Sequence, residues 1–147
     1  MRLEGSCHCG AVAFEMETDL IYPLFTCYCG RCRKVNGSPA SPYVTGRKSD
    51  LRILKGAAAM KTYNVDTNER SFCGLCGSSL FYMDSRWPEE CWPLASAIDT
   101  PLPTPERFVH IFVGSKAPWF PICAEGPQFD DYADLTAREL HERWGLI

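Results

Sequence analysis

The sequence has 147 residues, of which 15 are basic and 18 acidic, giving a formal net charge of −3. Hydrophobic residues make up 46% and charged residues 22%, so we expect residues 1–147 to form a single globular domain. Without an overall basic field, nucleic acid is not an expected partner. No signal sequence and no apolar run of about 18 residues is visible, which predicts a soluble, cytoplasmic protein without membrane contact.

Short segments with alternating apolar residues follow one another along the chain. In the first of them, Val12, Phe14 and Met16 alternate with Ala13 and Glu15, a pattern typical of a half-buried strand. Similar runs lie at 43–45, 51–54, 60–63, 79–83, 94–98 and 110–113. Strands this short, separated by turn-forming residues, predict a mainly β protein with small antiparallel sheets.

One helix is predicted near the C-terminus. Thr136 and Glu139 fit a capping box, and Gly145 is a suitable end for the segment. We expect this helix to pack on a sheet through Leu140 and Trp144. The prolines before it predict an irregular connection over residues 117–130.

The chain contains nine cysteines, and their number and grouping favour metal binding. An odd number without a signal sequence disfavours a complete disulfide framework. Seven of them form three tight clusters: Cys7-His8-Cys9, Cys27-Tyr28-Cys29-Gly30-Arg31-Cys32 and Cys73-Gly74-Leu75-Cys76. Zinc bound by thiolates at about 2.3 Å places the sulfurs about 3.8 Å apart, so we expect each cluster on a bent, knuckle-like loop around zinc.

Seven ligands divide naturally into four and three, which predicts two zinc ions per chain. The middle cluster can supply three thiolates to one metal, and the two outer pairs can complete a four-cysteine structural site. A site with three protein ligands leaves one tetrahedral position vacant, as in catalytic zinc sites. Spacing alone leaves another partition open, in which the first and second clusters share a metal.

The remaining cysteines and the histidines are expected to be structural. Cys91 and Cys123 stand alone in the sequence, and we expect both to be small buried hydrophobic residues. His8 would point away from the metal bound by its neighbours, His110 would begin an apolar strand, and His141 would lie on the surface of the helix.

At these clusters the sequence resembles the glutathione-dependent formaldehyde-activating (GFA) family. The likeness covers nearly the whole chain and is carried by residues 5–14, 27–34, 70–78, 97–99 and 110–119. The resemblance implies a β-tent-like fold with little helix. It also implies a structural zinc held by Cys7, Cys9, Cys73 and Cys76, and an active, open zinc held by Cys27, Cys29 and Cys32. The family usually has His and Ser at the positions of Tyr28 and Gly30 in this chain.

The activity implied by the resemblance is that of a carbon–sulfur lyase-type enzyme, which forms S-hydroxymethylglutathione from glutathione and formaldehyde. A small-molecule thiol, glutathione or a conjugate, would enter the vacant position of the zinc and lose its proton there. Arg31, Arg33 and Lys34 are candidates for contact with its carboxylates, although solvated surface charges are an equally good interpretation. The alternative hypothesis is a non-catalytic zinc-knuckle module that binds a protein partner, and a side chain blocking the fourth position would favour it.

Overall fold

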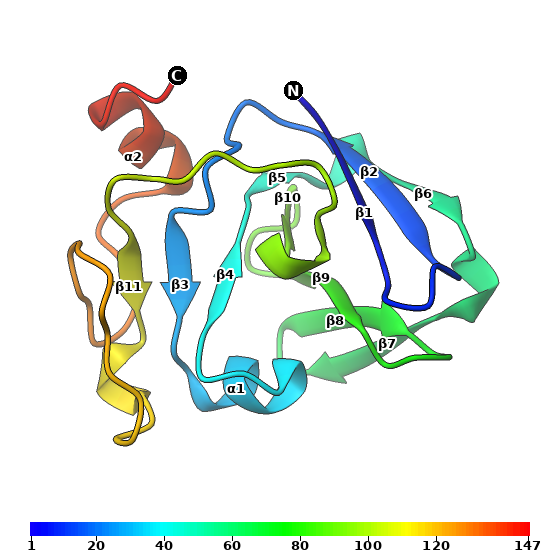
Figure 1. The fold of residues 1–147 in the computed structure, drawn as a ribbon, viewed down its shortest axis with the longest axis horizontal. Coiled ribbons are helices and arrows are strands. Elements are labelled where there is room, and N and C mark those ends of the chain that lie inside the picture. The colour runs from blue at the N-terminus through cyan, green and yellow to red at the C-terminus, as the bar shows by residue number, and fades with distance from the viewer.

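The computed structural model describes residues 1–147, which form a mainly β structure with three small sheets and two α-helices (Figure 1). The strands are β1 (Arg2–Ser6), β2 (Ala13–Glu17), β3 (Phe25–Cys27), β4 (Ser41–Tyr43), β5 (Gly46–Arg47), β6 (Leu51–Lys55), β7 (Met60–Val65), β8 (Asn68–Cys73), β9 (Ser79–Asp84), β10 (Glu90–Pro93) and β11 (Val109–Ile111). The helices are α1 (Gly30–Asn36) and α2 (Ala137–Arg143). Neither helix has the length and apolar character needed to cross a membrane.

The three sheets have the strand orders β1-β2-β6, β5-β10-β9-β8-β7 and β11-β3-β4. All strand pairs within them are antiparallel except β3 and β11, which are parallel with Phe25 opposite Val109. Parallel neighbours need a long crossover, and here the chain forms β4 to β10, and so completes the other two sheets, before it returns to β3. The late segment that carries β11 therefore lies beside the early segment that carries β3 (Figure 1).

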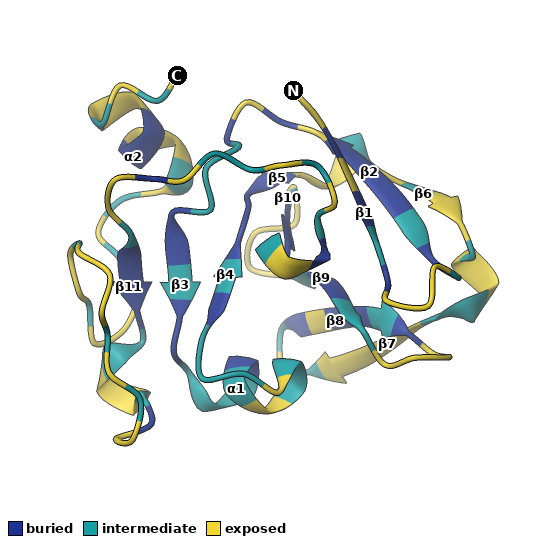
Figure 2. Ribbon diagram, in the orientation of Figure 1, coloured by how far each residue is buried: buried dark blue, intermediate teal, exposed yellow.

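The main core is a cluster of buried hydrophobic side chains that includes Phe14, Leu80, Val109 and Leu140. Outer strands β6 and β7 are largely exposed, whereas β11 is fully buried (Figure 2). Four cysteines of the predicted clusters also belong to this core: Cys7, Cys27, Cys32 and Cys73. Both predicted metal-binding groups are therefore anchored in well-packed structure rather than on free loops.

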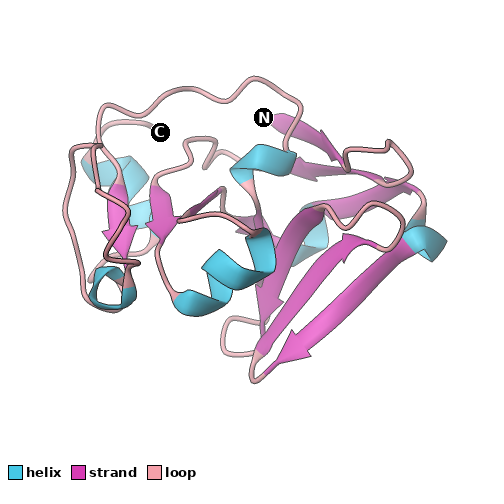
Figure 3. Cartoon of the chain, turned by 60° about the horizontal axis from the view of Figure 1, so that its bottom comes forward, coloured by secondary structure: helices cyan, strands magenta, loops and turns pink.

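Most of the predicted strands are confirmed, and strands and loops make up most of the fold (Figure 3). The run at 43–45 shares only Tyr43 with β4, and its other two residues lie between β4 and β5. The run at 94–98 is not a strand. Strand β10 ends just before it, and residues Ala95–Ala97 form a 3-10 turn. The ends of the run make single bridges to different strands, Leu94 to Tyr43 and Ile98 to Gly5. Leu94 and Ala97 are both buried in the core, three positions apart, as the 3-10 turn between them allows.

The predicted C-terminal helix is confirmed as α2. The Thr136 hydroxyl accepts a hydrogen bond from the Glu139 amide, and the Glu139 carboxylate accepts one from the Thr136 amide, which completes the capping box. The expectation that His141 lies on the surface is wrong, because its side chain is buried against Tyr22 and its Nδ1 donates to the Ala137 carbonyl at 2.7 Å.

Helix α1 was not expected from the sequence. Only one of its residues, Cys32, is buried, so no apolar periodicity marks it. Its N-cap is Cys29, whose sulfur accepts from the Cys32 amide at 3.3 Å, and its C-cap is Gly37 in the left-handed conformation. This short helix places two of the middle-cluster cysteines.

Candidate metal centres and the adjoining cavity

Four cysteines converge where two turns meet. Cys7 and Cys9 lie at the connection from β1 to β2, Cys73 ends β8, and Cys76 lies in the turn from β8 to β9. Their four sulfurs lie within 4.8 Å of one another. The Sγ–Sγ distance is 3.6 Å from Cys7 to Cys9 and 3.9 Å from Cys9 to Cys73.

The backbone around this group turns sharply and directs polar hydrogens at the sulfurs. The Val12 amide donates to Cys7 Sγ at 3.2 Å, and the Ser78 hydroxyl lies 3.2 Å from Cys76 Sγ. Gly10 and Gly77 directly follow cysteines and have φ of +73° and +78°, a conformation that glycine adopts without steric cost. Such donors stabilise sulfur in its ionised, metal-binding form.

The other three clustered cysteines meet at the end of β3 and the start of α1. Cys27 is the last residue of β3, Cys29 caps α1, and Cys32 lies in its first turn, so the cluster is a strand–turn–helix unit rather than the expected knuckle loop. Their sulfurs also lie within 4.8 Å of one another. No fourth cysteine, histidine or carboxylate contributes a ligand atom to this group.

Ionisation of one thiol in this group suppresses ionisation of its neighbours. Hydrogen bonds from Cys27 and Cys32 lower the pKa of Cys29 to about 2, and the hydrogen bond with Cys29 raises the pKa of Cys27. Three crowded sulfurs can all carry negative charge only if a cation offsets their repulsion.

Both groups fit a soft divalent metal ion. The spacing expected for a tetrahedral zinc–thiolate site is about 3.8 Å, close to the sulfur distances in the four-cysteine group. The structure brings the first and third sequence clusters together and leaves the second by itself.

A cavity of about 710 Å³ adjoins the three-cysteine group. All three cysteines line it, and Cys29 is the one whose side chain is only partly buried. The other walls carry aromatic residues, among them Tyr82 and Trp92, whose rings stack at 5.0 Å. A space of this size suits a ligand as large as a tripeptide.

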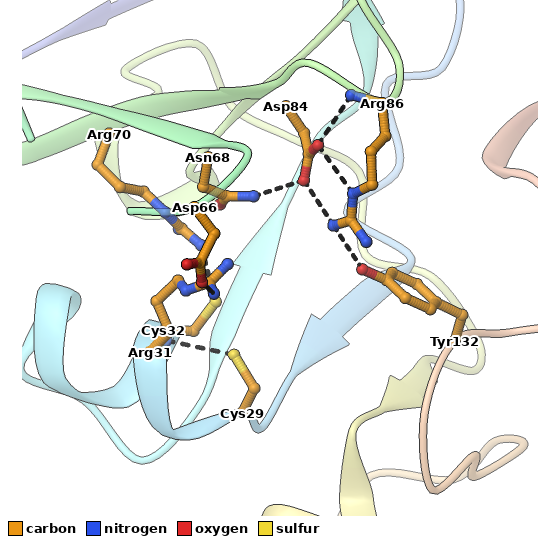
Figure 4. A network of polar contacts seen from close by, with 9 residues as sticks. All are labelled: Cys29, Arg31, Cys32, Asp66, Asn68, Arg70, Asp84, Arg86 and Tyr132. Atoms are coloured by element: carbon orange, nitrogen blue, oxygen red, sulfur yellow. Dashed lines mark hydrogen bonds and ion pairs between the residues drawn. The ribbon is translucent and has the colours of Figure 1, made fainter. Parts of the chain in front are cut away.

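Several charged side chains of the cavity form two groups of polar contacts (Figure 4). On one side, Arg31 Nη2 lies 2.8 Å from Asp66 Oδ2. On the other, the Asp84 carboxylate accepts from Arg86 through Nε at 3.0 Å and Nη2 at 2.7 Å, and Arg86 also donates to the Tyr132 hydroxyl. Burial opposes ionisation of Asp84, but the hydrogen bonds from Arg86 outweigh it and lower the pKa of the carboxyl.

Arg70 contacts the three-cysteine group directly. Its Nη2 lies 3.5 Å from Cys32 Sγ, and its guanidinium carbon lies 4.2 Å above the Tyr82 ring centroid. Sequence reasoning missed this residue. Two signals were available: Arg70 is a charged residue within a strand, three positions before a cysteine of the last cluster, and it begins the stretch 70–78 that carries the family resemblance.

The three cations predicted as substrate contacts lie in different places. Arg31 lines the cavity that holds the cysteines. Lys34 lines a second cavity of about 620 Å³, which also borders on Arg31. Arg33 lines neither cavity; its guanidinium donates to the backbone carbonyls of Tyr28 at 3.3 Å and Ser115 at 3.1 Å.

Tyr28 also points away from the cavity. Its hydroxyl lies 3.0 Å from His110 Nδ1, and His110 Nε2 lies 3.0 Å from the Ala124 carbonyl. Because the carbonyl can only accept, Nε2 carries the proton and the Tyr28 hydroxyl donates to Nδ1. Burial lowers the pKa of His110, in keeping with this neutral form.

The two isolated cysteines differ. Cys91 is fully buried, as expected. Cys123 is exposed, so the expectation of a buried residue is wrong. It follows Pro121 in the irregular connection, where no regular element holds it against the core.

Comparison with known proteins identifies relatives of the chain. The sequence profile of the glutathione-dependent formaldehyde-activating enzyme family matches residues 2–115. A protein of Halomonas elongata, provisionally named a glutathione-dependent formaldehyde-activating enzyme, is 38% identical over 154 aligned positions that cover 99% of this chain and 98% of the relative. A crystal structure of a Rhodobacter sphaeroides protein superimposes with a TM-score of 0.58 at 30% identity, covering 68% of this chain and 91% of that one.

Proposed function

Because the chain belongs to the glutathione-dependent formaldehyde-activating enzyme family, we propose that it is a zinc-dependent carbon–sulfur lyase-type enzyme. Its reaction would join glutathione and formaldehyde to S-hydroxymethylglutathione, or act on a similar glutathione adduct. Cys7, Cys9, Cys73 and Cys76 would hold a structural zinc. Cys27, Cys29 and Cys32 would hold a second zinc that is open to substrate.

The observation that carries the proposal is the three-sulfur group beside a cavity. Three converging thiols without a fourth protein ligand suit a metal with one position free for substrate. The cavity gives a ligand access to that position, because all three cysteines line it. A zinc-knuckle binding module would instead need a closed site, so this arrangement favours the enzyme.

In the proposed reaction the thiol sulfur of glutathione attacks the carbonyl carbon of the aldehyde. A carbon–sulfur bond forms, the carbonyl π bond breaks, and the proton lost by the thiol ends on the carbonyl oxygen, so no oxidant or reductant is needed. Zinc bound by the three cysteines would supply a site that deprotonates the thiol.

The protein side chains would bind and orient the two substrates. Arg31 lies close enough to the cysteines in the cavity wall to meet a carboxylate of the tripeptide, and its exposed bridge to Asp66 is of a kind that contributes little stability and opens readily. Lys34 in the second cavity, which Arg31 also borders, is placed for the other carboxylate. Arg33 is engaged with backbone carbonyls and would hold α1 in place.

The test measures catalysis and ligand binding on the same samples. Glutathione and formaldehyde combine without a catalyst, so exchange between free and adduct forms is followed by NMR with ¹³C-formaldehyde at equilibrium. We expect the exchange rate to rise in proportion to the zinc-loaded protein and to fall to the uncatalysed rate in Cys29→Ser. Cys123→Ser removes an exposed cysteine outside both groups and should behave like the unmodified protein.

Cobalt substitution provides the binding measurement. Added glutathione should change the visible absorption of the cobalt protein as sulfur enters its coordination sphere. An exchange rate independent of the protein, together with an unchanged cobalt spectrum at millimolar glutathione, would refute the enzyme proposal and favour a binding module.

A further inference from the structure

We propose that Arg70 is the counter-charge of the three-cysteine centre and gives it a preference for an anionic fourth ligand over a neutral one. The inference rests on the function proposed above and concerns a residue outside the predicted ligand set. Arg70 touches no substrate in this scheme and acts through Cys32, so it is a positioning residue.

Arg70 is a buried cation without an acidic partner. Its side chain lies in the middle of β8 and the residue is only 6% exposed. The other two arginines of the cavity are paired, Arg31 with Asp66 and Arg86 with Asp84. Arg70 forms no ion pair with any carboxylate, and its Nε has no hydrogen-bond partner.

A buried guanidinium needs compensating negative charge, because removal from water is costly for an unpaired ion. The contact within reach of Arg70 is Cys32 Sγ, 3.5 Å from Nη2. A thiolate at this position supplies the missing charge. The face of the Tyr82 ring, 4.2 Å from the guanidinium carbon, adds a weaker attraction and fixes the plane of the group.

The charge balance explains why this contact bears on ligand choice. Three thiolates around a divalent ion carry a net charge of about −1, and a fourth thiolate would make it about −2. The cation of Arg70 offsets one of these charges in a buried environment, where charge interactions are stronger than in water. A neutral ligand adds no charge and therefore gains little from Arg70.

The experiment compares two ligands on the cobalt-substituted protein. The first is 2-mercaptoethanol, which binds as a thiolate and has no carboxylate that could contact an arginine directly. The second is imidazole, which binds as a neutral ligand. Each is titrated by the change in visible absorption, so the readout is binding and not turnover.

In Arg70→Met we expect the affinity for 2-mercaptoethanol to fall roughly 10- to 100-fold, a loss as large as the one that removing a partner of a metal ligand usually causes in metal affinity or activity. The affinity for imidazole should change by no more than about threefold, since its interaction with the charge is weak. Arg70→Gln is a second neutral variant for the same comparison. Arg70→Lys retains the charge and should keep most of the preference for the thiolate.

Arg31→Met is the matched control, because it removes the same charge from the same cavity wall but from a residue already paired with Asp66. It should leave the ratio of the two affinities unchanged. Equal losses for both ligands in Arg70→Met and Arg70→Gln would reveal a merely structural role and overturn the inference, as would no loss for either. An unmodified protein that binds imidazole but no thiol would overturn the inference together with the proposed function, whereas thiol binding without catalysed exchange would refute the proposed function alone.

Discussion

The two cysteine groups should contribute very differently to stability, and single substitutions can measure the difference. Cys76→Ser removes a ligand of the four-cysteine group, and Cys29→Ser removes one of the three-cysteine group. Cys76 is exposed and Cys29 is half-buried, so neither change leaves a large cavity in the core. Differences between the variants then report mainly on the loss of the metal cross-link.

The magnitude follows from the length of chain that a metal in each group would close. The four-cysteine group joins Cys9 to Cys73, which are 64 positions apart, and the three-cysteine group joins residues within the segment 27–32. Treated as cross-links that restrict the unfolded chain, the first is worth about 4 kcal/mol and the second about 2 kcal/mol. At roughly 2–4 °C per kcal/mol for a chain of this size, the expected losses in Tm are about 10 °C and about 5 °C.

The assay is thermal and urea unfolding of the metal-loaded proteins, with metal content measured on the same samples. Cys123→Ser serves as the control, because it removes an exposed cysteine that belongs to neither group. Equal destabilisation by Cys76→Ser and Cys29→Ser, with one metal lost from each, would show that the division into a structural and an open site is wrong.

Three further predictions concern the metals, the backbone and pH. Protein purified without chelator should contain two zinc ions per chain, and metal analysis that gives one ion or none after careful reconstitution would contradict this. Gly56→Ala should lower the unfolding free energy by more than about 1 kcal/mol, because Gly56 has a φ of +73° and a Cβ there would collide with the Ala11 carbonyl. An unchanged urea unfolding curve would show that the substitution causes no such strain. The pKa of Asp84 is lowered from 3.8 in the folded protein, so the ionised carboxylate stabilises the fold above the pKa of the unfolded chain. This stabilisation is lost as the pH falls through the pKa that Asp84 has in the folded protein. Asp84→Asn should therefore destabilise the protein at pH 7 and flatten the loss of stability below about pH 4; parallel pH profiles for the two proteins would count against the role of the carboxylate.

Features set by neighbouring residues were predictable from the sequence. The capping box of α2 depends on Thr136 and Glu139, which are three positions apart, and the cysteine clusters depend on spacings of two to three residues. The alternation around Phe14 likewise identified β2, although Glu15 on the other face of the strand is also buried and pairs with Arg2 and Arg52. In each case the physical cause acts within one turn or one strand, so the sequence pattern contains it.

Features created by packing between distant segments were not predictable in this way. His141 is buried by contact with Tyr22, far away in the chain, and a helical pattern cannot report that. Arg70 meets Cys32 only because β8 passes beside α1. Helix α1 itself has no apolar stripe, since its main contribution to the core is one cysteine.

The order in which the cysteines leave the ribosome adds a constraint on metal loading. The three-cysteine group is complete once residue 32 has been synthesised. Cys7 and Cys9 can form their group only after Cys73 and Cys76 have also been synthesised. During that interval a metal ion would meet five thiols on one short nascent segment, and the first two clusters could share it. Release of Cys7 and Cys9 would then depend on translation reaching the β8–β9 turn. A metal ion taken up before that point would have to move from this early partition to the one that the finished fold favours.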